Sequence, residues 1–201
     1  MARPRHNQNA VATTERILEA AEIEFATHGF AARLSDISAR AGIRRPSLLY
    51  HFGNKEDLYR AVVQRTFADL GEALLNGRSV PGDFVVRLQS MTRTFTAHLD
   101  RNQNAARIIV HEIIAPEGPG QALLLEQVTP LMDAIELWIQ TAGCDHIRPG
   151  IPVRLAVLQL ASDVVLRNAS GALRPALWIG HDDHTTWALA RVTLLNEGGH
   201  S

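Results

Sequence analysis

The apolar positions in the first 75 residues recur three and four apart, which predicts a series of α-helices. Local signals bound each helix: Gly29 and Gly42 end the first two, Pro46 suits the first turn of the third, and Asn54 caps the fourth. The predicted helices span residues 13–28, 34–41, 46–52 and 55–75, with Thr13 or Thr14 as the first N-cap.

Beyond residue 75 the helical repeat continues, and no segment shows the sustained alternation typical of a strand. Gly77, Pro81 and Gly82 separate the two parts of the chain. Further helices are predicted at residues 83–100, 104–114, 120–141, 152–169 and 183–195, divided by Gly- and Pro-containing stretches such as 171–180. We therefore expect an all-α protein in which three short helices precede a larger helical part.

The second and third predicted helices have the length and spacing of a helix-turn-helix unit. Gly42 allows the left-handed backbone of the tight turn, and Ile43 closes the corner. In such a unit the N-terminal end of the second helix meets base edges in the major groove of DNA. The residues available for this are Arg44, Arg45, Pro46 and Ser47, with Tyr50 and His51 one turn on and Lys55 placed for a phosphate. A solvated arginine pair in an ordinary bundle has the same spacing, so spacing alone leaves DNA binding open.

The charge distribution adds modest support for a polyanionic partner. The formal net charge is −1, so the chain as a whole gives no reason to expect nucleic acid. Between residues 33 and 60, however, six basic side chains stand against three acidic ones. The basic set is Arg33, Arg40, Arg44, Arg45, Lys55 and Arg60. This is a local positive patch on a nearly neutral protein.

The remaining composition excludes several classes of protein. Hydrophobic residues make up 46% and charged residues 20%, the balance of a folded globular chain. Cys144 is the single cysteine, so neither an intrachain disulfide nor a cysteine-rich metal site is expected. The polar start MARPRHNQNA and the lack of a long apolar run favour a cytoplasmic protein without a membrane partner. No phosphate loop, nucleophile elbow or zinc spacing is present, so we expect neither an enzyme nor a cofactor.

Several spaced motifs agree with one known family. RILEAAEIEFATHGF, followed by LSDISARAGIRRPSLLYHFGNKEDLY, closely resembles the N-terminal DNA-binding domain of TetR-family transcriptional regulators, of the TetR/AcrR helix-turn-helix type. The resemblance covers residues 14 to about 61, roughly a quarter of the chain. It implies that Arg45, Pro46, Ser47, Tyr50 and His51 occupy recognition-helix positions and that Lys55 matches a phosphate-contacting lysine.

Three positions depart from the family pattern. Arg33 stands where the family usually has a Thr or Ser cap for the second helix, although Arg33 could itself reach a phosphate. Arg44 replaces a common serine, and Leu49 replaces a frequent aromatic residue. Residues 1–12 are expected to form a flexible arm, with entry into a minor groove as the alternative.

The resemblance implies a helix-turn-helix domain at residues 13–60 and a helical regulatory domain at 61–201 that dimerises and binds a small-molecule effector. Polar residues that interrupt its apolar helices could orient a ligand in a pocket. The candidates are His98, His111, Glu112, Trp138 and Asn168, each of which has a purely structural alternative. Asp163 and Arg167, four residues apart, are two further candidates, and the structural alternative expected for them is an ion pair within one helix.

Together these observations predict a homodimeric, sequence-specific DNA-binding regulator that pairs through its last two helices. We expect a repressor that a small-molecule effector releases from a palindromic operator, with an activator, or a helical interaction module without DNA binding, as alternatives. The stretch WIGHDDHTTW at residues 178–187 holds two histidines and two aspartates. A helix that begins there would not direct all four to one ion, so no metal site is expected.

Overall fold

The computed structural model describes residues 5–115, 119–180 and 183–196, and within them the regular elements are helical, apart from one isolated bridge between Ile147 and Leu195. The α-helices are α1 (Arg5–His28), α2 (Leu34–Arg40), α3 (Arg45–Phe52), α4 (Lys55–Arg78), α5 (Phe84–Arg101), α6 (Gln103–Ile114), α7 (Pro119–Ala142), α8 (Val153–Ala169), α9 (Arg174–Leu177) and α10 (Asp183–Leu194). Two 3-10 turns, η1 (Gly29–Ala31) and η2 (Gly171–Leu173), complete the set. The all-α class predicted from the sequence is confirmed.

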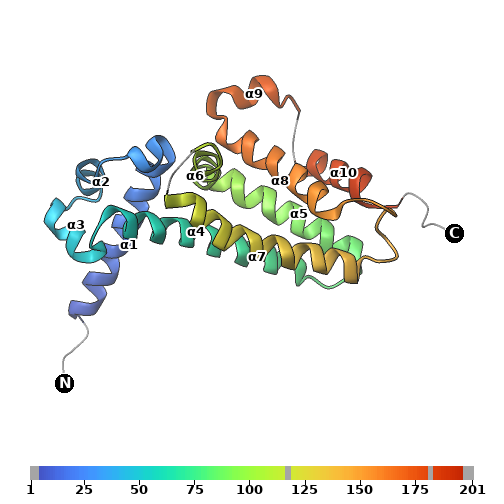
Figure 1. The fold of residues 1–201 in the computed structure, drawn as a ribbon, viewed down its shortest axis with the longest axis horizontal. Coiled ribbons are helices and arrows are strands. Elements are labelled where there is room, and N and C mark those ends of the chain that lie inside the picture. Colours follow the sequence, from blue (N-terminus) through green and yellow to red (C-terminus); the bar gives the residue numbers. More distant parts are fainter. Residues whose placement is uncertain (1–4, 116–118, 181–182, 197–201) are drawn as a thin grey trace.

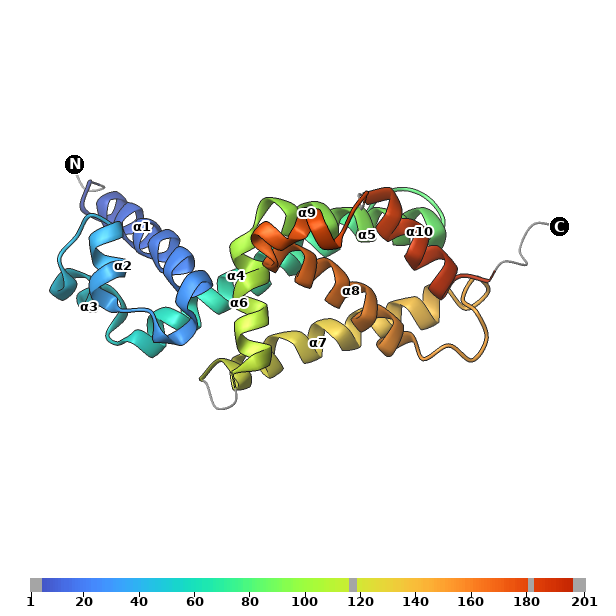
Figure 2. The same cartoon turned by 90° about the horizontal axis from the view of Figure 1, so that it is seen from above.

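The helices form two groups joined by α4. Figure 1 shows α1, α2 and α3 gathered at one end of the molecule and α5 to α10 at the other. Figure 2, seen from above, shows α4 leaving the first group and running into the second. Within the second group α4 packs against α5 and α7, and α6 also reaches back to α1. No helix among the described residues is long and apolar enough to cross a membrane.

Local capping explains where the helices of the first group begin and end. Gly42 has a φ of 68°, which lets the chain turn sharply between α2 and α3. The Ile43 amide then donates to the Ser38 carbonyl at 3.0 Å and closes the end of α2. The Asn54 side chain accepts from the Asp57 amide at 2.8 Å and caps α4 as the sequence predicts. The turn geometry is thus fixed by short-range contacts.

The N-terminal cap predicted at Thr13 or Thr14 is wrong, because α1 already begins at Arg5. Residues 5–12, expected as part of a flexible arm, are its first turns, and they contain neither Gly nor Pro to interrupt a helix. The Thr14 hydroxyl donates to the Ala10 carbonyl at 3.0 Å instead of capping. A threonine inside a helix commonly makes this bond to the carbonyl four residues earlier.

One hydrophobic core runs through both groups. Its fully buried members extend from Ile17 in α1 to Val164 in α8 and include Phe25, Leu48 and Tyr59. A second, smaller cluster lies at the far end of the molecule, where Phe84, Ile139 and Leu194 belong to α5, α7 and α10. Because the larger core passes through α4 and α6, the two helical groups are packed as one continuous structure.

Candidate DNA-binding surface and ligand cavity

The first turn of α3 presents its side chains to solvent. Arg44 precedes the helix in an extended conformation, and its side chain makes no capping hydrogen bond. The exposed side chains are Arg44, Arg45, Pro46, Ser47 and, one turn on, Tyr50. Tyr50 is 88% exposed, an unusual position for a large aromatic side chain. Leu48 is fully buried and anchors the helix, so α3 is held by its apolar side while its polar side remains available.

His51 is held in place by α1. Its Nδ1 lies 3.1 Å from the Thr14 hydroxyl, and the ring is half-buried. The Tyr50 ring meets it edge-on at 5.8 Å between centroids. Sequence reasoning placed His51 in the recognition helix but missed Thr14, because the two residues are 37 positions apart and no local pattern connects them.

Lys55 lies at the start of α4 over the ring of Phe30, with Nζ 4.5 Å from the ring centroid. This cation–π contact fixes the ammonium group beside the free amides of the first turn. Partial burial lowers the pKa of Lys55 from its ordinary value. Arg33 is exposed at the N-cap position of α2 and makes no capping hydrogen bond, as its departure from the family pattern indicates.

Not all of the local basic patch is free for an anionic partner. Arg40 donates to Glu24 at 2.8 Å, and Arg60 lies 3.7 Å from Glu126. Among the ion pairs of the described residues, none involves Arg33, Arg44 or Arg45. The uncompensated positive charge therefore lies around the helix-turn-helix, where a phosphate backbone would approach.

The helices of the second group line a partly open cavity of about 510 Å³. This volume is in the range of small-molecule sites in proteins. Its walls come from six helices, and one lining residue from each is Phe67, Phe95, Ile109, Leu131, Val164 and Leu194. The polar lining residues are Thr92, Ser162 and Thr186. A ligand for this cavity would be mainly apolar.

None of the five predicted effector-pocket residues lines this cavity. His98 is half-buried on α5, and burial lowers its pKa. His111 lies against Gly29 of η1, with Nδ1 3.2 Å from where a Cβ on that residue would stand. Trp138 packs on Phe84, with 5.1 Å between ring centroids. These side chains contribute to packing between helices, the structural alternative open to each.

Glu112 and Asn168 are almost fully buried. Glu112 makes a polar contact with another helix, and Asn168 makes one within its own helix and one with α9. The Tyr59 hydroxyl donates to Glu112 Oε1, joining α4 to α6. Burial raises the pKa of Glu112 above its ordinary value. Asn168 donates to the Val164 carbonyl at 3.0 Å and accepts from Arg174 at 2.8 Å. The amide and carboxylate therefore fasten helices together.

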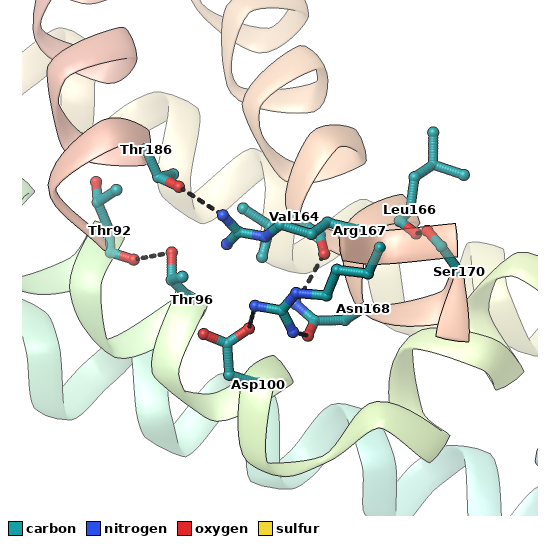
Figure 3. A network of polar contacts seen from close by, with 10 residues as sticks. Thr92, Thr96, Asp100, Val164, Leu166, Arg167, Asn168, Ser170 and Thr186 are labelled. Carbon is teal, nitrogen blue, oxygen red and sulfur yellow. Dashed lines mark hydrogen bonds and ion pairs between the residues drawn. The ribbon is translucent and has the colours of Figure 1, made fainter. Parts of the chain in front are cut away.

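The predicted ion pair between Asp163 and Arg167 is wrong. Asp163 accepts from the Trp178 indole at 2.8 Å, which secures the segment after α9. Arg167 is 1% exposed and reaches Thr186 on α10, 3.5 Å from Nη1 (Figure 3). The two side chains point to different neighbours, because contacts between helices outweigh the favourable i, i+4 spacing.

The predicted absence of a metal site in residues 178–187 lies partly outside the described residues, since His181 and Asp182 fall there. Across the described ranges, no group of three His, Cys, Asp or Glu side chains is arranged to hold an ion.

The helices of the first group are the part of the chain that matches a known protein family. Residues 17–62 match the sequence model described as bacterial regulatory proteins, tetR family. The chain is 42% identical over 60 residues to an HTH-type transcriptional repressor, SCO4008 of Streptomyces coelicolor, and 30% identical over 95 residues to an HTH-type transcriptional activator, FasR of Mycolicibacterium smegmatis. These matches cover 29% and 47% of this chain, and span only 31% and 43% of the relatives' own lengths.

A solved structure extends the likeness to the whole fold. The complex of SmeT, a Stenotrophomonas maltophilia repressor, with triclosan superposes with a TM-score of 0.71. The alignment covers 93% of each chain at 22% identity, so it establishes the fold alone. Residues 17–62 thus match the tetR family of bacterial regulatory proteins, and the chain as a whole shares the fold of SmeT.

Proposed function

We propose that the protein is a homodimeric transcriptional regulator that binds an operator through α3 and is released by a small apolar effector in the cavity. The observation that carries this proposal is the exposed first turn of α3. Arg44 and Arg45 are free of ion pairs among the described residues, and Leu48 anchors the helix behind them. Arginine forks pair with the two acceptors of guanine, and an N-terminal helix end fits the major groove.

Lys55, Arg33 and His51 surround α3 and are proposed to contact the DNA backbone. Lys55 stands at a helix N-terminus, where free amides favour phosphate. His51 is fixed by Thr14, so it would meet DNA with little loss of side-chain entropy. A regulator of this kind would act in the cytoplasm, where bacterial DNA lies, and we assign it no catalytic role.

Dimerisation is proposed through α8 and α10, as the sequence predicts. These helices expose five apolar side chains, each 40–61% accessible: Leu155, Leu158, Leu166, Leu189 and Val192. Several exposed apolar side chains on two helices that pack together are typical of a protein interface. A two-fold axis there would place the two copies of α3 on successive major grooves of a palindromic operator.

The route from cavity to DNA would run through α6. Ile109 of α6 lines the cavity, and Glu112 on the same helix contacts Tyr59 of α4. His111 touches Gly29 at the end of α1. An effector that shifts α6 would thereby move α4 and change the separation of the two recognition helices. It can do so only by binding the DNA-free form more tightly.

The sign of regulation is proposed to be repression. One curated relative is a repressor and the other an activator, and SmeT is described as the repressor of a multidrug efflux pump. The triclosan complex of SmeT supports a small, largely apolar effector in this fold, which agrees with the apolar lining of the cavity here.

The test is a mobility-shift titration on DNA that flanks the protein's own gene, with scrambled competitor DNA and two salt concentrations. We expect competitor-resistant binding whose affinity falls steeply with salt, because phosphate contacts release counterions. Arg45→Ala should lose at least about tenfold in operator affinity, the range of one bidentate base contact. Arg101→Ala, an exposed arginine on α5, is the matched control. Unchanged affinity and base preference in Arg45→Ala would disprove the role of α3.

A further inference from the structure

The guanidinium group of Arg167 is buried without an anionic partner among the described residues. The side chain is 1% exposed, and its one hydrogen bond is the 3.5 Å contact from Nη1 to the Thr186 hydroxyl. Nε and Nη2 have no hydrogen-bond partner. Transfer of a charge from water into a protein interior is costly unless the charge is paired, so an isolated buried guanidinium calls for an anion.

Two carboxylates of the described residues near Arg167 are already engaged. Asp163 accepts from Trp178, and Asp100 pairs with Arg174 at 3.0 Å. Arg174 donates to Asn168 at 2.8 Å and to Asp100 at 3.0 Å. Figure 3 shows the guanidinium of Arg167 reaching toward Thr186 instead. The positive charge of Arg167 therefore has no carboxylate partner within this network of described residues.

Arg167 does not itself line the apolar cavity, but the residue it contacts and its neighbours on α8 do. Thr186, its hydrogen-bond partner on α10, is a lining residue, and so is Thr92, which Figure 3 places across from it on α5. The neighbouring residues on its own helix, Val165 and Leu166, also line the cavity. The hydroxyls of Thr92 and Ser162 bond to carbonyls of their own helices at 2.9 and 2.7 Å. Arg167 thus has two nitrogens with unused hydrogen-bonding capacity next to this lining.

The two unpaired nitrogens have the geometry that a carboxylate requires. Nε and Nη2 lie on the same edge of the planar guanidinium, and their N–H groups point in parallel. A carboxylate accepts two parallel hydrogen bonds from such an edge, and this pairing is stronger than one between neutral groups. A neutral hydroxyl can accept only one bond at a time and brings no compensating charge.

We propose that the effector is an apolar molecule with one carboxylate group. Its apolar body fills the cavity, and its carboxylate accepts from Nε and Nη2 of Arg167. This inference rests on the proposed function of the cavity as the effector site, and it adds the chemical class of the ligand. Arg167 is one of the candidates named from the sequence, although its expected role there was an ion pair with Asp163.

The test compares carboxylates with alcohols that share the same apolar body. Displacement of the neutral fluorophore 1-aminoanthracene from the full-length protein at pH 7.5 would report dodecanoate against dodecan-1-ol, and 2-naphthoate against 2-naphthalenemethanol. Both acids are ionised at this pH. We expect the carboxylate of at least one pair to bind about tenfold or more tightly than its alcohol, as for a hydrogen bond to a charged group. No preference in either pair would overturn the proposal.

Variants of Arg167 test whether this side chain causes the preference for carboxylates over alcohols. Arg167→Gln and the volume-conserving Arg167→Met should abolish the carboxylate preference while the alcohols bind as before. Arg154→Gln, on the same helix but paired with Asp133 and Glu136, should retain it. A preference that survives in both Arg167 variants would place the anion elsewhere and overturn the proposal. If neither variant folds, the wild-type comparison still decides whether the cavity selects carboxylates.

Operator binding in the same preparations separates this inference from the proposed function. DNA binding without carboxylate preference would refute the ligand class and leave the regulator intact. Carboxylate preference without binding to any flanking DNA would instead count against the regulator. With both present, the preferred carboxylate should release the operator from the wild type but not from Arg167→Met.

Discussion

The hydroxyl of Tyr59 donates to the buried carboxylate of Glu112, joining α4 to α6, a helix that lines the cavity. Phe25 and Phe30 meet the Tyr59 ring edge-on at 4.7 and 5.2 Å between centroids. One aromatic residue thus contacts α1, η1 and α6 together. A movement of α6 would therefore change the contacts of Tyr59 directly.

Replacement of Tyr59 by Phe should keep the packing and remove the hydrogen bond. Glu112 would then be a buried acceptor with no donor, which typically costs about 1–3 kcal/mol. We expect urea denaturation to show this loss in the free energy of unfolding, with an unchanged dependence on denaturant. Effector release of the operator should also weaken. The removal of a phenolic hydroxyl with no loss of stability would mean that the carboxylate is satisfied by another group.

The raised pKa of Glu112 predicts a specific pH dependence. Because burial favours the protonated carboxyl in the folded state, this group contributes most to stability below its ordinary pKa of 4.5. Its contribution falls as the pH rises through the raised pKa. Glu112→Gln cannot lose a proton, so the stability difference between variant and wild type should grow from pH 4.5 toward neutral pH in favour of the variant.

Urea unfolding curves of both proteins over this pH range would measure that difference. Glu22, whose pKa is also raised by burial, titrates equally in both proteins and cancels in the comparison. A constant difference across the range would show that Glu112 has the same pKa folded and unfolded.

Two glycines should respond oppositely to the same substitution. Gly42 has a positive φ in the turn before α3, so Gly42→Ala should cost about 1 kcal/mol from backbone strain alone, since no atom lies within 4 Å of the added methyl. Gly71, inside α4, has equally free space and an ordinary φ, so Gly71→Ala should stabilise by about 0.5–1 kcal/mol. Thermal unfolding of both variants checks the sign. Equal signs would contradict the backbone argument.

Thr14 should affect DNA binding without contacting DNA. Thr14→Val removes the hydroxyl that holds His51 at 3.1 Å, so the ring should lose its fixed orientation. We expect a decrease of about threefold to tenfold in operator affinity, the value of one hydrogen bond. Thr27→Val is the matched control, since its hydroxyl bonds only to the Ile23 carbonyl in the same helix. An equal effect of the two substitutions would remove the special role of Thr14.

Short-range chemistry explains how much of the fold could be predicted. Gly42 and Asn54 act within three or four residues, so their roles in a turn and a cap could be predicted from the sequence. Thr14 shows the limit of this approach, because a threonine suits an N-cap and a helix interior, and the flanking residues decide. The first turns of α1 were missed for that reason.

The two candidate sites also differ in how far they could be predicted from the sequence. The exposed polar face of α3 follows from a local motif, whereas the cavity is bounded by six helices that are distant in sequence. Polar residues in apolar helices were expected to mark it, yet Glu112 and Asn168 serve contacts within the protein. Arg167 was assigned to an ion pair with Asp163 because their spacing permits one. Only the packed structure shows that its guanidinium edge is unpaired.

The continuous core from Ile17 to Val165 has a consequence for how such proteins can diverge. Helix α6 packs against α1 and Tyr59. The first three helices can therefore be joined to a different C-terminal domain only if that domain has a helix complementary to them. Under the proposed function, operator preference can change on the exposed side of α3 without affecting this packing. The inner sides of α1, α4 and α6 must change together.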